Sequence, residues 1–196
     1  MNELILQELQ TLGSVDLKDH FVYQIGKAQI DLENAPYGGA RYPVTAMIDG
    51  KLFVRFQLDI GADIIVNRVE NIQGTNWLEF CGISSPMIPM ISIEQQFAEK
   101  LHTYTLPRAD KVNSRAKDLI DMVLLLNMKN LKIEECQYAL QRVFKIRDTH
   151  PLPGKLGKPP IDWQSQFTAM AAECGLSPDM REAFEAVARF YEGMGQ

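Results

Sequence analysis

The chain has 196 residues, of which 46% are apolar and 23% are charged, and its net charge is −5 at pH 7. This composition is typical of a folded globular protein and excludes wholesale disorder. No run of about 18 apolar residues occurs, which argues against a transmembrane helix, and the acidic start argues against a signal peptide. Three widely spaced cysteines exclude a disulfide framework and fit a reducing compartment such as the cytoplasm.

The charges are unevenly distributed along the chain. Residues 1–99 carry 6 basic and 13 acidic side chains, residues 100–158 carry 12 and 6, and residues 159–196 carry 2 and 6. A basic middle segment between acidic flanks could face a polyanion; the alternative is a solvated surface with chance clustering. The negative total charge argues against strong sequence-independent binding to nucleic acid.

The first part of the chain predicts one helix followed by strands. Apolar residues recur near the helical period over 3–12, and alternation from residue 21 predicts strands over 21–32. Two longer alternating runs, 42–48 and 52–60, flank Asp49-Gly50, which predicts a hairpin with a two-residue type I′ turn.

This hairpin assigns the side chains of its second strand to two faces. One face is apolar and is expected to join the core: Leu52, Val54, Phe56, Leu58 and Ile60. The other face is mostly polar and carries Asp59. If Ile48 pairs with Lys51, Asp59 lies near Ala40 and Arg41 on the partner strand.

The remainder of the chain predicts a connector and then five helices. Glycine and proline punctuate residues 61–91, with a short strand expected over 63–69. Ser92 is a candidate N-cap for a helix over 93–104. Further helices are expected over 114–126, 133–146, 162–173 and 178–193, with a Pro/Gly-rich loop at 149–160. The fold class is therefore α+β, with a small antiparallel sheet in residues 1–90 and a helical lobe in residues 91–196.

Asp59 and Lys100 are the first two candidate functional residues. An outward-facing carboxylate on a strand, such as Asp59, can serve as a metal ligand or a general base, although many strands carry one such group. Lys100 lies off the apolar face of its helix, where it can reach an anion, although most isolated lysines are simply solvated.

The third candidate is the cluster Arg115, Lys117, Asp118 and Asp121. The two aspartates are three residues apart and share a helical surface, with Arg115 and Lys117 as local cationic partners. Surface ion pairs of this kind contribute only about 0.3–0.5 kcal/mol each. The sharper interpretation is a positioned acid on the wall of a phosphate site, because the helix that follows is almost wholly apolar.

Taken in order, these segments resemble the AbiEii/AbiGii nucleotidyltransferase toxins over residues 15–190. Residues 37–61 resemble the central hairpin of that family, which ends in the motif Phe56-Gln57-Leu58-Asp59-Ile60-Gly61. Two downstream helical motifs are similar as well: residues 91–102, which contain Glu99-Lys100-Leu101-His102, and Arg115-Ala116-Lys117-Asp118-Leu119-Ile120-Asp121.

The resemblance implies a nucleotidyltransferase-like sheet and roles for six residues. Asp59 would be a catalytic carboxylate and a ligand to Mg²⁺. Asp118 and Asp121 would be acids of the active-site helix, with Lys100, Arg115 and Lys117 in nucleotide binding. The implied function is transfer of a nucleotide from NTP to an RNA (such as tRNA) or protein acceptor by a toxin of an abortive-infection or toxin–antitoxin system. An antitoxin partner and a homodimer are expected, with no membrane association.

The sequence also departs from the family pattern. The family has a Gly-Ser turn and an Asp-x-Asp pair before the third carboxylate, and no Asp-x-Asp precedes Asp59. One carboxylate cannot hold two Mg²⁺ ions. We therefore expect that the missing motifs lie upstream of Met1 and that this chain is truncated and inactive by itself. The alternative is a non-catalytic binding or scaffold protein derived from this family.

Overall fold

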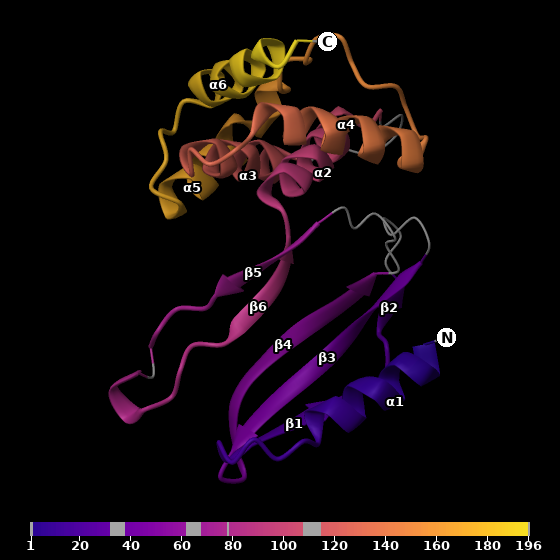
Figure 1. The fold of residues 1–196 in the computed structure, drawn as a ribbon, viewed down its shortest axis with the longest axis vertical. Helices are drawn as coiled ribbons and strands as arrows, with labels where there is room; N and C mark the ends of the chain where they lie inside the picture. The colour runs from indigo at the N-terminus through magenta and orange to yellow at the C-terminus, as the bar shows by residue number, and fades with distance from the viewer. Residues whose placement is uncertain (1, 32–37, 62–67, 78, 108–114, 196) are drawn as a thin grey trace. The chain divides into compact units, whose positions relative to one another are not determined.

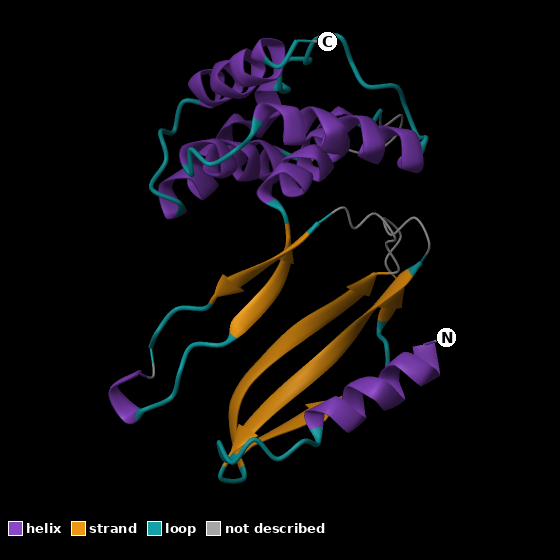
Figure 2. Ribbon diagram, in the orientation of Figure 1, coloured by secondary structure: helices purple, strands orange, loops and turns teal. Residues whose placement is uncertain are grey.

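The computed structural model describes residues 2–31, 38–61, 68–77, 79–107 and 115–195. By packing, the chain divides into two compact units, residues 1–64 and residues 65–196 (Figure 1). After one N-terminal helix, antiparallel strands come first and the other helices follow, which confirms the α+β class (Figure 2). The division by packing falls between residues 64 and 65. The lobe boundary expected at residue 90 stays a prediction.

The first unit consists of one helix and a four-stranded antiparallel sheet. Its elements are α1 (Asn2–Gly13), β1 (Phe21–Ile25), β2 (Ile30–Asp31), β3 (Gly39–Ile48) and β4 (Lys51–Gly61). β3 is the central strand, because it pairs with β1 and β2 as well as with β4. The strands expected over 21–32 are β1 and β2, which pair with different parts of β3.

The β3–β4 hairpin confirms the predicted turn and contains one irregularity. Asp49 and Gly50 have φ angles of 49° and 70°, as a type I′ turn requires, and Ile48 pairs with Lys51. The register shifts between Ala46 and Met47, which marks a β-bulge in β4. Beyond the bulge, Asp59 lies directly opposite Arg41.

Only one strand of this hairpin is well buried. Alternate residues of β3 are buried, namely Ala40, Tyr42, Val44 and Ala46. On β4, Leu52, Val54 and Phe56 are exposed by 50%, 42% and 43%, so the expectation that they lie in the core is wrong. The reason is that α1 packs against β1, where Gln10 Nε2 donates to the carbonyl of Ile25 at 2.9 Å, and leaves this part of β4 uncovered.

The second unit begins with a strand pair in the stretch for which the sequence predicts a connector. β5 (Val69–Gln73) and β6 (Met87–Ile91) pair in antiparallel fashion, and the 3₁₀ turn η1 (Glu79–Cys81) lies between them (Figure 2). Pro86 and Pro89 argue against strands in this part of the sequence, because proline is depleted in strands. The short strand expected over 63–69 falls mostly on residues outside those described.

The five predicted helices are confirmed. They are α2 (Ile93–Thr105), α3 (Ala116–Asn127), α4 (Ile133–Arg147), α5 (Gln164–Glu173), which follows the turn η2 (Ile161–Trp163), and α6 (Met180–Gly193). Ser92 caps α2, because its hydroxyl oxygen accepts the amide N–H of Gln95 at 3.2 Å. The loop at 149–160 has no helix or strand, as predicted.

The helices share one apolar core, which fixes α2 against its neighbours. Phe97 and Leu101 of α2, Leu119 of α3, Val143 of α4 and Phe167 of α5 are fully buried. The rings of Phe97 and Phe190 meet edge to face at 5.3 Å, and those of Tyr104 and Trp163 do so at 5.7 Å. Since α2 and α3 are held by this core, the polar side chains between them have fixed neighbours.

Candidate active site

The candidate cluster lies between α2 and α3. Lys100 lies in the middle of α2, between buried Ala98 and Leu101, and Asp118 and Asp121 lie on adjacent turns of α3. The Nζ atom of Lys100 is 2.7 Å from Oδ2 of Asp121 and 3.7 Å from Oδ1 of Asp118. Lys100 therefore bridges both acids. In the sequence, Lys100 belongs to one motif and the two aspartates belong to another.

Asp118 is the most buried charged group of this cluster. Its side chain is 6% exposed, and Thr103 Oγ1 donates a hydrogen bond to its Oδ2 at 3.0 Å. Arg115 stands 3.5 Å from the same oxygen. Burial raises the pKa of the Asp118 carboxyl above its ordinary value, although Arg115, Thr103 and Lys100 favour its charged form. Asp118 is thus a buried carboxyl group whose oxygens face hydrogen-bond donors from α2 and from the start of α3.

The cations of the cluster remain accessible. The side chains of Lys100 and Arg115 are 36% and 25% exposed, whereas that of Asp118 is almost fully covered. When all four groups are charged, the positive charges of Lys100 and Arg115 balance the negative charges of the two aspartates. Such an arrangement holds an ammonium and a guanidinium in fixed positions at a surface, where both can contact a phosphate.

The local ion pairs predicted for α3 have different outcomes. The pair between Arg115 and Asp118 is present. Asp121 forms its ion pair with Lys100 of α2, and Lys117 is exposed. The structure therefore brings together Lys100, Arg115, Asp118 and Asp121, and places Lys117 on the solvent side of the same helix.

Asp59 lies in the first unit and has a different environment. Arg41 clamps it through two contacts, Nε to Oδ1 at 2.6 Å and NH2 to Oδ2 at 2.7 Å. This confirms the expected position of Asp59 beside Arg41. Hydrogen bonding from Arg41 holds the pKa of the Asp59 carboxyl below its ordinary value. The roles that the family resemblance implies for Asp59 and Lys100 require both residues to line one surface, and this stays a prediction.

The described residues do not by themselves fit a Mg²⁺ ion. Among them, no group of three or more His, Cys, Asp or Glu side chains is placed to hold a metal. Both oxygens of Asp59 already accept from Arg41, and Mg²⁺ requires near-octahedral oxygen coordination.

Sequence reasoning missed two groups of polar residues beside this cluster. Thr103 stands three residues after Lys100, a helical spacing that could have identified it as a neighbour of the acids. On α2, Glu99 pairs with Arg147 at 2.6 Å, and the Nε2 atom of His102 lies 2.8 Å from Thr149 Oγ1. No local pattern signals these contacts, because they join residues 47 and 48 positions apart.

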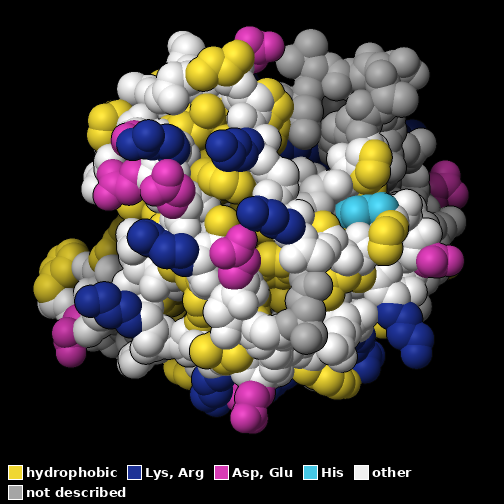
Figure 3. Space-filling view, turned by 90° about the horizontal axis from the view of Figure 1, so that it is seen from above, with side chains coloured by type: hydrophobic (Ala, Val, Ile, Leu, Met, Phe, Trp, Pro, Cys, Tyr) yellow, Lys and Arg dark blue, Asp and Glu magenta, His cyan; other side chains and the backbone are white. Residues whose placement is uncertain are grey.

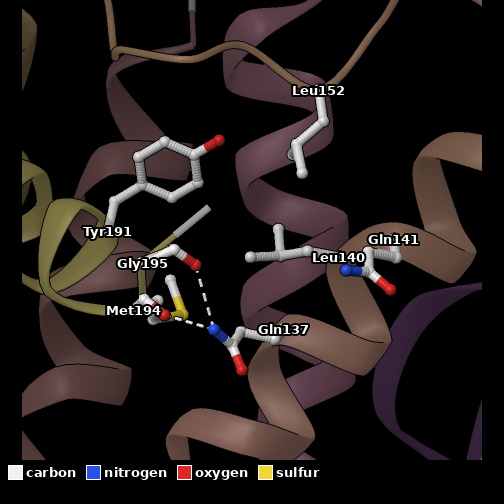
Figure 4. Close-up of a pocket in the computed structure, with 7 residues that line it drawn as sticks. All are labelled: Gln137, Leu140, Gln141, Leu152, Tyr191, Met194 and Gly195. Atoms are coloured by element: carbon white, nitrogen blue, oxygen red, sulfur yellow. Dashed lines mark hydrogen bonds between the residues drawn. The ribbon is translucent and has the colours of Figure 1, made fainter.

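A pocket elsewhere in the helical unit has no candidate residue in its wall. Its volume is about 190 Å³, and Figure 4 shows the Gln137 amide directed at the carbonyl oxygens of Met194 and Gly195. The lining residues are Gln137, Leu140, Gln141, Leu152, Tyr191, Met194 and Gly195. The candidate cluster is thus a separate surface site.

Comparison with protein families gives a match over nearly the whole chain. A model of the nucleotidyl transferase AbiEii toxins of type IV toxin–antitoxin systems matches residues 1–190. The chain belongs to this AbiEii family. The match confirms the resemblance drawn from the hairpin and the two helical motifs. A search of curated proteins found no match for this AbiEii-family chain. Among its described residues, no helix is long and apolar enough to cross a membrane.

Proposed function

We propose that this AbiEii-family chain takes part in the transfer of a nucleotide from NTP to an RNA, such as tRNA, or to a protein acceptor. It would do so as a toxin of an abortive-infection or toxin–antitoxin system in the cytoplasm. The observation that carries the proposal is the bridge from Lys100 to Asp118 and Asp121, since it holds a cation at an accessible surface. Family membership supplies the reaction class.

Each residue of the cluster has a proposed role. Lys100 and Arg115 contact the phosphates of the nucleotide, and exposed Lys117 adds positive potential. Asp121 and Asp118 position the ammonium of Lys100, because their oxygens lie 2.7 Å and 3.7 Å from it. Mg²⁺ is an expectation from the family, in which Asp59 would supply one carboxylate.

We further propose that residues 1–196 do not transfer nucleotides by themselves, since a single metal-binding carboxylate cannot position two Mg²⁺ ions. The alternative function is a non-catalytic binding or scaffold protein of the same family. The observation in its favour is the two-point clamp of Arg41 on Asp59, which gives this carboxylate a structural partner. Expected partners are NTP, an antitoxin and a second copy of the chain.

Nucleotide binding tests the role of Lys100 without requiring turnover. Calorimetric titration of the protein with NTP and Mg²⁺ should show weaker binding for Lys100→Gln by about tenfold or more, as expected for loss of a charge-assisted contact. Lys158→Gln, at an exposed loop position, is the matched control and should bind like the unmodified chain. Equal affinities for the two variants would refute the proposed role of Lys100.

A transfer assay separates the two functions. The chain is incubated with labelled NTPs, Mg²⁺ and total tRNA, and we expect no labelled product. Robust labelling that disappears in Asp59→Ala would show that the chain is an active enzyme as it stands. NTP binding without labelling would agree with the proposed inactivity of residues 1–196.

A further inference from the structure

The exposed side of α4 carries polar and basic residues at helical spacing. Tyr138 lies three and four residues before Gln141 and Arg142, and these lie four and three residues before Lys145, so the four residues share one side of the helix. We call these four residues the α4 outer face. Tyr138 is 58% exposed, and Gln141 and Lys145 are exposed as well. The opposite side of α4 supplies Cys136, Leu140 and Val143 to the core.

This face lies in a basic part of the chain and holds no acid. Residues 129–158 contain seven Lys and Arg against three Asp and Glu. Two of those acids, Glu134 and Glu135, stand in the first turn of α4, and Asp148 follows its end. On the molecular face drawn in Figure 3, basic side chains are interspersed with acidic and apolar ones. Within the α4 outer face the two cations stand without an acid, and Asp148 is the acid that follows the end of the helix.

Tyr138 and Arg142 are arranged as a pair. The NH1 group of Arg142 lies 3.4 Å from the hydroxyl of Tyr138. The Nε atom of Arg142 is shielded from solvent and has no hydrogen-bond partner among the described residues. Because Nε is shielded, a ligand can meet Arg142 only at the outer end of its guanidinium, which stands next to an exposed aromatic ring.

Two hollows flank Lys145. The first has a volume of about 410 Å³ and is lined by the α4 outer face together with Ile146. The second, of about 490 Å³, includes Lys145, Thr149 and His150, with Asp148 as an acid on its wall. The cationic side chain between the hollows can reach an anion that occupies either of them.

We propose that the α4 outer face binds single-stranded RNA. Arg142 and Lys145 would contact successive phosphates, and a base would stack on the Tyr138 ring. A positive groove beside an exposed aromatic ring is the combination by which proteins hold single strands without reading their sequence. Because the chain is acidic as a whole, binding is weak and strongly dependent on salt.

The consequence for the reaction rests on the proposed function. If the chain serves nucleotide transfer, this face favours RNA over protein as the acceptor class. RNA association is measured without NTP, so a failure of nucleotide transfer does not affect that measurement. Conversely, a failure to bind RNA would contradict the role of the α4 outer face but not the proposed nucleotide site.

Fluorescence anisotropy with a labelled single-stranded oligoribonucleotide tests the proposal. Two phosphate contacts predict a slope of about −1.4 in the logarithm of affinity against the logarithm of salt. Affinity should therefore fall about sevenfold between about 50 mM and about 200 mM salt. Lys145→Gln should halve the slope, and Tyr138→Ala should weaken binding at least about fivefold while Tyr138→Phe retains it.

Arg189→Gln on α6 is the matched control, because it removes an exposed cation from another helix of the same unit. It should leave both affinity and slope unchanged, and circular dichroism should show that all variants are folded. Equal effects of Lys145→Gln and Arg189→Gln would overturn the proposal. Binding to phosphatidylserine vesicles without binding to the oligoribonucleotide would overturn it as well, since a membrane surface would then be the partner.

Discussion

His102 should make the stability of the helical unit depend on pH. The residue is 3% exposed, and its ring lies against those of Phe144 and His150, at 4.9 Å and 4.8 Å. Its Nδ1 atom is buried without a hydrogen-bond partner among the described residues. Burial lowers the pKa of His102 from 6.5 to about 4, and the positive charges of His150 and Arg147 act in the same direction.

The sign and size of the effect follow from proton linkage. As the pH falls from 6.5 to about 4, the unfolded chain gains a proton at His102 that the folded chain does not accept. The stability contributed by neutral His102 is therefore present above the unfolded pKa and is lost as the pH falls toward the folded pKa. The difference between the two pKa values corresponds to about 3 kcal/mol of unfolding free energy. The pKa of His150 is also lowered by burial, which adds in the same direction.

Urea unfolding followed by circular dichroism measures this loss between about pH 7 and about pH 4.5. His102→Gln keeps a polar side chain next to Thr149 but cannot titrate, so its unfolding free energy should vary much less with pH. His20→Asn is the matched control, because His20 is exposed. If His102→Gln loses stability toward low pH as steeply as His20→Asn does, His102 is not the titrating group and the reasoning is refuted.

Three further outcomes are expected. Thr103→Val should lower the unfolding free energy by about 1 kcal/mol because Asp118 loses a donor, whereas Thr103→Ser should not; equal urea midpoints for both would contradict this. Arg41→Gln should raise the pKa of Asp59 toward its ordinary value in an NMR carboxyl titration, and an unchanged titration would show that the clamp does not persist in solution. Exposed apolar residues of β4, and its second edge, which has no partner strand among the residues that the structure describes, predict a two-fold dimer; a monodisperse monomer of 22.2 kDa in light scattering at high concentration would exclude it.

Much of the fold follows from periodicity and turn chemistry. The Asp49-Gly50 pair fixes the hairpin turn because it adopts positive φ at little cost, and the five helices follow from apolar spacing. The β5–β6 pair could not be predicted, since its strands are short and one contains Pro89. Burial of β4 was overestimated because alternation shows that a strand has an apolar face but does not show whether another element covers it.

The candidate site was predictable only within each segment. Helical spacing correctly grouped Asp118 with Asp121 and placed Lys100 off its apolar face. It could not show that Lys100 crosses to α3, because the two segments are joined through a stretch with no strong pattern. A contact between helices depends on how their cores pack, and residue spacing along one helix holds no information about that.

The bulge in β4 decides by simple parity which side of the sheet Asp59 occupies. Across a two-residue turn at 49–50, the numbers of facing residues must add up to 99, so an even-numbered residue would always face an odd-numbered one. Asp59 would then share a side with buried Ala40, and Tyr42 would face Gln57. Most apolar residues of both strands are even-numbered, so the side chains of Tyr42, Val44 and Ala46 can meet those of Leu58, Phe56 and Val54 only if one strand contains an extra residue. Their numbering thus already demanded the irregularity. Loss of the extra residue would leave Asp59 opposite Arg41, whereas gain of another residue between the turn and Asp59 would place Asp59, at the existing register, on the side of buried Ala40.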